Sequence, residues 1–165
     1  MKINFGGRMV NLKGKGVEVG QKAPDFKVLA QDLSEKKLSD FKEDFIVLSL
    51  APSIDTSVCS HQTKQFYQKL AEHRNTRLIA LTNDLPFAQK RWCEGEGVDS
   101  ATLLSDYRDL DFALNYGVLI EELRLLARGV FILDQARNIV YKEILKDAGN
   151  LPDFDAALNA LKELS

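Results

Sequence analysis

Short apolar runs alternate along the chain with longer segments in which apolar residues recur every three to four positions. A continuous apolar run is typical of a strand covered on both faces of a sheet, and the helical period indicates an amphipathic helix. The strands predicted in this way are 45–50, 77–82, 101–104, 129–134 and 139–145. The predicted helices are 56–73, 83–94 with Gly95 and Gly97 as its stop, 110–116 and 152–164.

The N-terminal region predicts a β-hairpin over about residues 1–19. Two short β-type stretches, 2–5 and 9–12, flank Gly6-Gly7-Arg8, and the glycines supply the positive φ that a tight turn needs. We expect this hairpin to decorate the main unit rather than to form a domain. Residues 26–30 are expected to form an edge strand, followed by a polar loop that extends to residue 41.

The order of the predicted elements is βαβα, then a short β and α, then a β-hairpin and α. This order favours an α/β fold of the thioredoxin-like type, a three-layer sandwich with a mixed central β-sheet and the N-terminal β-hairpin. A length of 165 residues suits one compact unit, and no repeat or linker divides the chain. We therefore expect a single domain over 1–165.

Charge and hydropathy exclude several classes of partner. The chain has 22 basic and 24 acidic residues and a net charge of −2, so no overall field would recruit nucleic acid or an anionic membrane. No stretch has the roughly 18 apolar residues of a membrane span, and the N-terminus lacks an apolar region of signal-peptide type. We expect a cytoplasmic location, with neither nucleic acid nor a membrane as partner.

Candidate chemistry centres on Cys59, which follows the 45–50 strand in the first turn of a predicted helix. A thiol there lies near the positive end of the helix dipole and near N–H groups without intrahelical partners, which favours the nucleophilic thiolate. From residue type alone, such a cysteine is more often a small buried apolar residue. Thr56, three residues earlier, is placed to cap the helix.

The chain has only two cysteines, Cys59 and Cys93, and in a reducing compartment such a pair is more often free, metal-bound or redox-active than structural. Cys59 and His61 project to different sides of a helix, and no further ligands follow nearby. The segment Gly95-Glu96-Gly97 lacks the third glycine of a dinucleotide motif and follows a helix. We therefore expect no metal and no cofactor.

The spacing Pro52-x-x-x-Thr56-x-x-Cys59 resembles the motif of the thiol peroxidase branch of the peroxiredoxins. The similarity extends to residues 20–26, to 83–89 before Cys93, and to 126–128 before a buried strand. It covers essentially the whole chain. The complete string from Pro52 to Cys59 reverses the interpretation of Cys59 as packing and favours a nucleophile.

The resemblance implies an atypical two-cysteine peroxiredoxin, a thiol-specific peroxidase that reduces hydrogen peroxide and organic hydroperoxides in antioxidant defence. Cys59 would attack the peroxide and become sulfenic acid, and Cys93 would resolve it as an intramolecular disulfide. Thr56 and Arg128 would polarise the peroxide, and Pro52 would shield the bound substrate. The resemblance also implies thioredoxin as reductant and a homodimer as the assembly.

Several alternatives stay open at this point. Thr56 could be only a helix cap, Arg128 a surface ion pair and Cys93 simple packing. A redox-signalling or thiol–disulfide exchange protein on the same fold is the rival function, although exchange normally needs Cys-x-x-Cys, which Cys59-Ser60-His61-Gln62 lacks. Cysteines on two helices are expected to lie beyond the roughly 7 Å Cα separation of a disulfide, so both segments would have to unfold locally.

Overall fold

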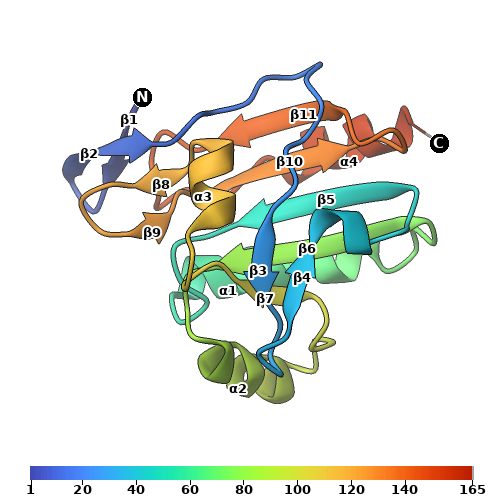
Figure 1. Cartoon of the computed structure of the whole chain (residues 1–165), viewed down its shortest axis with the longest axis horizontal. Coiled ribbons are helices and arrows are strands. Elements are labelled where there is room, and N and C mark those ends of the chain that lie inside the picture. The colour runs from blue at the N-terminus through green and yellow to red at the C-terminus, as the bar shows by residue number, and fades with distance from the viewer. Residues whose placement is uncertain (165) are drawn as a thin grey trace.

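The computed structural model describes residues 1–164, which form two β-sheets and four α-helices (Figure 1). The larger sheet has the strand order β11-β10-β5-β6-β7-β3-β4. Its strands are, in chain order, β3 (Lys27–Leu29), β4 (Glu35–Lys37), β5 (Phe45–Leu50), β6 (Thr76–Thr82), β7 (Leu103–Ser105), β10 (Gly129–Leu133) and β11 (Ile139–Ile144). The pairs β5–β6 and β6–β7 are parallel and the other pairs antiparallel, so the predicted mixed sheet is confirmed.

Helices cover both faces of the larger sheet. Alternate residues of β5 point to opposite faces, and the apolar side chains on each face pack in a separate cluster. Val47 belongs to an apolar cluster with Phe66 and Leu161, whereas Leu48 belongs to a cluster with Tyr116. In Figure 1, α3 lies in front of the larger sheet and α1 behind it. The helices are α1 (Ser57–Leu70), α2 (Pro86–Glu96), α3 (Asp111–Tyr116) and α4 (Phe154–Lys162), with a 3₁₀ turn η1 (Leu38–Asp40).

The N-terminal hairpin is more than a decoration. It forms a four-stranded sheet in the order β1-β2-β8-β9, whose strands are β1 (Lys2–Phe5), β2 (Arg8–Lys13), β8 (Leu119–Ile120) and β9 (Leu125–Leu126). Ile3 is 0% and Val10 1% exposed, and both belong to the same cluster as Leu48 of the larger sheet. The hairpin was predicted correctly as a local unit, but its contribution to the core depends on pairing with β8, more than a hundred residues later.

Two further predictions were wrong in detail. The predicted polar loop contains β4, which pairs antiparallel with β3, so β4 rather than β3 is the edge strand. A short charged strand such as Glu35–Lys37 suits an exposed edge and shows no apolar alternation. Gly95 does not stop α2, which continues to Glu96 and is capped by Gly97 in the left-handed conformation at φ 71°.

Candidate active site

The register of the larger sheet brings three distant chain segments together at one end of its central strands. Leu50, the last residue of β5, lies opposite Leu81 of the parallel β6 and opposite Gly129 of the antiparallel β10. The chain leaves β5 and β6 and enters β10 at this same end. The segment after β5, the segment after β6 and Arg128 before β10 therefore meet there.

Thr56 caps the helix that carries Cys59, as predicted. Its hydroxyl oxygen accepts the N–H of Cys59 at 3.2 Å, and its hydroxyl proton is donated to the carbonyl of Ser53 at 3.1 Å. Cys59 is the third residue of α1, so its N–H is one of the groups that lack an intrahelical partner. The cap thus fixes the turn that carries the thiol.

Cys59 is reduced and 0% exposed. Its carbonyl accepts a hydrogen bond from the hydroxyl of Thr63, 3.0 Å away and one turn further along α1. Burial of the thiol limits the number of water molecules around it.

Arg128 is 3% exposed, which rules out a surface ion pair. Its Nε donates to the carbonyl of Ala148 at 2.8 Å, and its Nη1 donates to Oε1 of Gln62 at 2.9 Å. Among residues 1–164, no carboxylate forms a salt bridge with it. A buried cation held only by neutral acceptors favours the binding of negative charge beside it.

Gln62 is a site residue that the sequence analysis missed. It is 0% exposed, lies three residues after Cys59 on α1, and donates from Nε2 to Ser49 Oγ at 2.8 Å and to the Leu50 carbonyl at 3.1 Å. Its amide therefore ties Arg128 to β5 and to the helix of Cys59. One feature of the sequence could have indicated this role: Gln62 is a polar amide on the apolar face of the predicted helix, one turn before Phe66.

A cavity of about 200 Å³ opens over the first turn of α1. Apolar groups dominate its walls, and Arg128 and Thr56 supply the polar ones. The lining residues are Phe5, Gly6, Pro52, Thr56, Val58, Arg128, Ala148 and Gly149. The structure thus brings the predicted Pro52, Thr56 and Arg128 together at the turn of Cys59, and it adds the tip of the N-terminal hairpin as a wall that was not predicted.

Cys93 lies apart from this cavity, on α2. It is reduced, 2% exposed and packed in a cluster with Ile54 and Trp92. Burial raises the pKa of the Cys93 thiol, and the charge of Asp99 adds to the increase, while the hydrogen bond from Gln31 Nε2 to the sulfur at 3.4 Å opposes it. The folded protein therefore keeps this thiol protonated and shielded.

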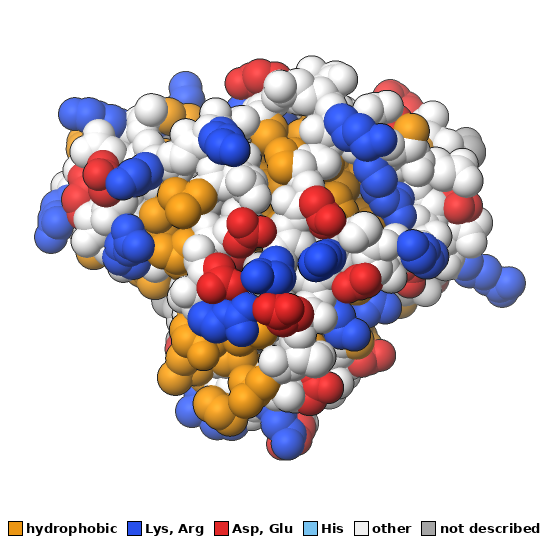
Figure 2. All heavy atoms as spheres, in the orientation of Figure 1, with side chains coloured by type: hydrophobic (Ala, Val, Ile, Leu, Met, Phe, Trp, Pro, Cys, Tyr) orange, Lys and Arg blue, Asp and Glu red, His pale blue; other side chains and the backbone are white. Residues whose placement is uncertain are grey.

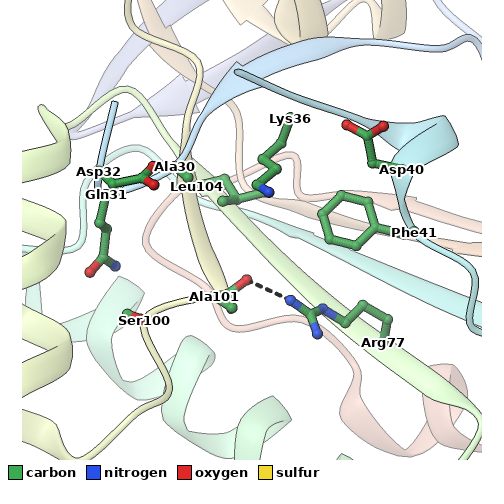
Figure 3. A pocket seen from close by; sticks show the side chains of 10 residues that line it. All are labelled: Ala30, Gln31, Asp32, Lys36, Asp40, Phe41, Arg77, Ser100, Ala101 and Leu104. Carbon is green, nitrogen blue, oxygen red and sulfur yellow. Dashed lines mark hydrogen bonds between the residues drawn. The ribbon is translucent and has the colours of Figure 1, made fainter. Parts of the chain in front are cut away.

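Gln31 also borders a separate cavity of about 310 Å³, shown in Figure 3. Arg77 lies across that cavity and donates to the carbonyl of Ala101 at 3.0 Å. None of the site residues predicted from the sequence lines this cavity. A metal centre is not supported in the described part of the chain, since no group of three or more His, Cys, Asp or Glu side chains could hold an ion there.

Comparison with known proteins shows the family and supports the fold. The model of the Redoxin family matches residues 18–158. A peroxiredoxin-like protein from Aquifex aeolicus has the same fold with a TM-score of 0.92 and 36% identity, covering 99% of this chain and 97% of that one. A thiol peroxidase from Chromobacterium violaceum superimposes with a TM-score of 0.88 at 25% identity, covering 99% and 96% of the two chains.

The fold and the family match together show that the chain belongs to the Redoxin family. It is 48% identical to the thiol peroxidase of Oceanobacillus iheyensis over 161 residues, 98% of each chain. It is 45% identical to the thiol peroxidase of Bacillus subtilis over 163 residues, 99% of this chain and 98% of that one. The chain is thus a peroxiredoxin-type oxidoreductase of the thiol peroxidase branch, which carries out thiol-dependent peroxide reduction.

Proposed function

We propose that the chain reduces hydrogen peroxide and organic hydroperoxides with Cys59 as peroxidatic nucleophile and Cys93 as resolving thiol. The observation that carries the proposal is the buried Arg128, which has no carboxylate partner in residues 1–164 and is held by Gln62 on the same helix as Cys59. A fixed, buried cation bonded to the helix of a buried thiol suits a reaction in which negative charge moves from sulfur to oxygen.

In the first step, the Cys59 thiolate attacks the terminal oxygen of the hydroperoxide and the O–O bond breaks. The sulfur is oxidised to sulfenic acid, and the departing alkoxide or hydroxide takes a proton and leaves as alcohol or water. The guanidinium of Arg128 lines the cavity and has donors beyond the two that bind Ala148 and Gln62. It can stabilise charge on both sulfur and leaving oxygen.

The cavity walls support a role for organic as well as inorganic peroxides. Phe5, Val58 and Pro52 offer apolar surface beside the polar groups of Arg128 and Thr56. An alkyl or aryl group can pack against that surface while the peroxide oxygens face the guanidinium. Pro52 is buried and serves as a wall that shields the reacting atoms.

In the second step, the Cys93 thiol attacks the sulfenic sulfur of Cys59, a disulfide forms and water leaves. Both cysteines are buried on different helices, so both segments must open before the sulfurs meet. Gly95, inside α2, lowers the helical stability of the segment around Cys93. A dithiol reductant, thioredoxin by resemblance, would then reduce the disulfide and become oxidised itself.

The assembly and location follow the same resemblance. Apolar side chains gather over α2 in Figure 2. At the start of that helix, Leu85 is 51% and Phe87 65% exposed. Such a patch suits contact with another protein chain, here a second copy in a homodimer.

We propose one domain over 1–165 and a cytoplasmic location. No helix in residues 1–164 is long and apolar enough to cross a membrane.

Stopped-flow oxidation tests the proposal. Reduced protein is mixed with micromolar hydrogen peroxide or cumene hydroperoxide, and peroxide consumption is followed. We expect reaction far faster than that of free cysteine, complete loss in Cys59→Ser, and a single turnover without thioredoxin recycling in Cys93→Ser. Reaction at the rate of free cysteine would contradict the proposal, and full recycling by Cys93→Ser would show a one-cysteine enzyme.

A further inference from the structure

Asp84 lies between β6 and α2 and binds the loop that leads to Cys59. Its Oδ1 accepts from the hydroxyl of Ser53, and its Oδ2 accepts from the N–H of Ile54 and from the hydroxyl of Thr82, each at 2.7 Å. No residue among 1–164 forms a salt bridge with this carboxylate. Three donors from two chain segments thus converge on this one carboxylate.

Ser53 transmits the position of Asp84 to the reactive turn. Its hydroxyl donates to Asp84, and its carbonyl accepts the hydroxyl proton of Thr56 at 3.1 Å. The oxygen of that same hydroxyl accepts the N–H of Cys59 at 3.2 Å. A continuous series of hydrogen bonds therefore runs from Asp84 through Ser53 and Thr56 to the backbone of Cys59.

The other side of Asp84 connects to the helix of the second cysteine. The Thr82 oxygen accepts from Nε2 of Gln89 at 3.0 Å, and the same amide nitrogen donates to the Leu104 carbonyl at 2.9 Å. Gln89 is 0% exposed and lies on α2, four residues before Cys93. Asp84 thus anchors the loop before Cys59 to the base of the helix that carries Cys93.

We propose that Asp84 is a positioning residue that holds the loop before Cys59 in its peroxide-reactive conformation, an inference that rests on the proposed function. The two chemical steps make opposite demands on this loop. Reaction with peroxide needs the turn fixed so that Thr56 and Arg128 face the cavity with the thiol, whereas disulfide formation needs the turn to open. Loss of the carboxylate therefore slows the first step and leaves the second step unchanged or faster.

Asp84→Asn is the direct test, because asparagine keeps the size but presents one acceptor oxygen to three donors. The first step is measured by rapid-quench trapping of the Cys59 sulfenic acid with dimedone in a Cys93→Ser background. The second step is measured by mass spectrometry in a background that retains both cysteines, as the rate constant for conversion of the Cys59 sulfenic acid to the disulfide at peroxide concentrations high enough to make the first step fast. We expect the first rate constant to fall about tenfold or more, as is usual when a hydrogen bond to a carboxylate is lost, and the rate constant of the second step not to fall.

Asp111→Asn is the matched control. This carboxylate also accepts a backbone N–H, that of Lys27 at 2.8 Å, but it lies on α3. We expect both rate constants in this variant to match those of the parent protein. If Asp111→Asn slows the first step as much as Asp84→Asn does, the loss is not specific to the loop and the inference is overturned.

A double variant tests whether Asp84 acts through Thr56. If it does, Asp84→Asn adds little to Thr56→Val, and the double variant reacts with peroxide about as slowly as Thr56→Val alone. If the rate reductions of Asp84→Asn and Thr56→Val multiply in full in the double variant, Asp84 does not act through Thr56. Ser53→Ala removes only one of the donors to Asp84, so we expect it to slow the first step selectively but to a smaller extent. It replaces Asp84→Asn as the test if that variant does not fold.

Two results would overturn the inference as a whole: a folded Asp84→Asn with an unchanged first step, or equal slowing of both steps. Failure of the proposed function would look different, because the parent protein itself would then react with peroxide no faster than free cysteine. A fast parent together with an equally fast Asp84→Asn would reject the role of Asp84 alone.

Discussion

Nη1 of Arg128 donates a 2.9 Å hydrogen bond to Oε1 of Gln62, one turn after Cys59 on α1. The cation and the thiol are therefore positioned by the same helix, although Arg128 is 69 residues away in the sequence from Cys59. The side-chain amide of Gln62 is itself held in place, because its nitrogen donates to Ser49 and Leu50 of β5 while its oxygen accepts from Arg128.

Gln62→Leu should slow the reaction of reduced protein with peroxide by about tenfold or more, since an unsatisfied buried donor costs about 1–3 kcal/mol and Arg128 would shift to recover a partner. The second-order rate constant from stopped-flow measurements checks this. Gln68→Leu on the exposed side of the same helix is the control and should react like the parent. Equal rates for the parent and Gln62→Leu would show that Arg128 needs no such support.

Thr56→Val should lower both stability and reactivity. The hydroxyl accepts the Cys59 N–H and donates to the Ser53 carbonyl, and loss of a threonine cap costs about 0.5–2 kcal/mol. Urea unfolding measures the first effect and stopped-flow oxidation the second. Thr56→Ser retains the hydroxyl and should recover most of both. A Thr56→Val protein with full reactivity would limit Thr56 to structural capping.

Cys93 should be less reactive than a free cysteine between about pH 7 and 9, because burial raises the pKa of its thiol. The stabilisation associated with the raised pKa is present below the pKa of the unfolded thiol and is lost as pH rises through the folded value. Alkylation by iodoacetamide in Cys59→Ser measures the effect. Low urea should accelerate labelling through local opening of α2. Labelling at the rate of free cysteine at pH 7 would contradict the shielding.

The elements most visible in the sequence are those whose residues carry their own signal. β5 and β10 are buried on both faces and leave continuous apolar runs. By contrast, β4 is three charged residues, and β8 and β9 are two residues each. Such short strands depend on partners elsewhere in the chain, and local pattern contains no information about those partners.

The same distinction applies to the site. Pro52, Thr56 and Cys59 lie within eight residues, and their spacing predicts the capped turn directly. Arg128 could be assigned only through the resemblance, because its place depends on the register that sets Gly129 opposite Leu50. Gln62 and Asp84 act through side-chain hydrogen bonds to segments fixed by that register. Their roles therefore became visible only in the folded structure.

The proposed mechanism depends on a disulfide between Cys59 and Cys93, and mass spectrometry of the peroxide-treated protein detects that disulfide directly. Reduced protein is treated with one equivalent of hydrogen peroxide, alkylated, digested without reduction and analysed. We expect one intramolecular crosslink that joins the peptides of Cys59 and Cys93. Sulfenic or sulfinic acid at Cys59 together with an alkylated Cys93 and no crosslink would contradict it.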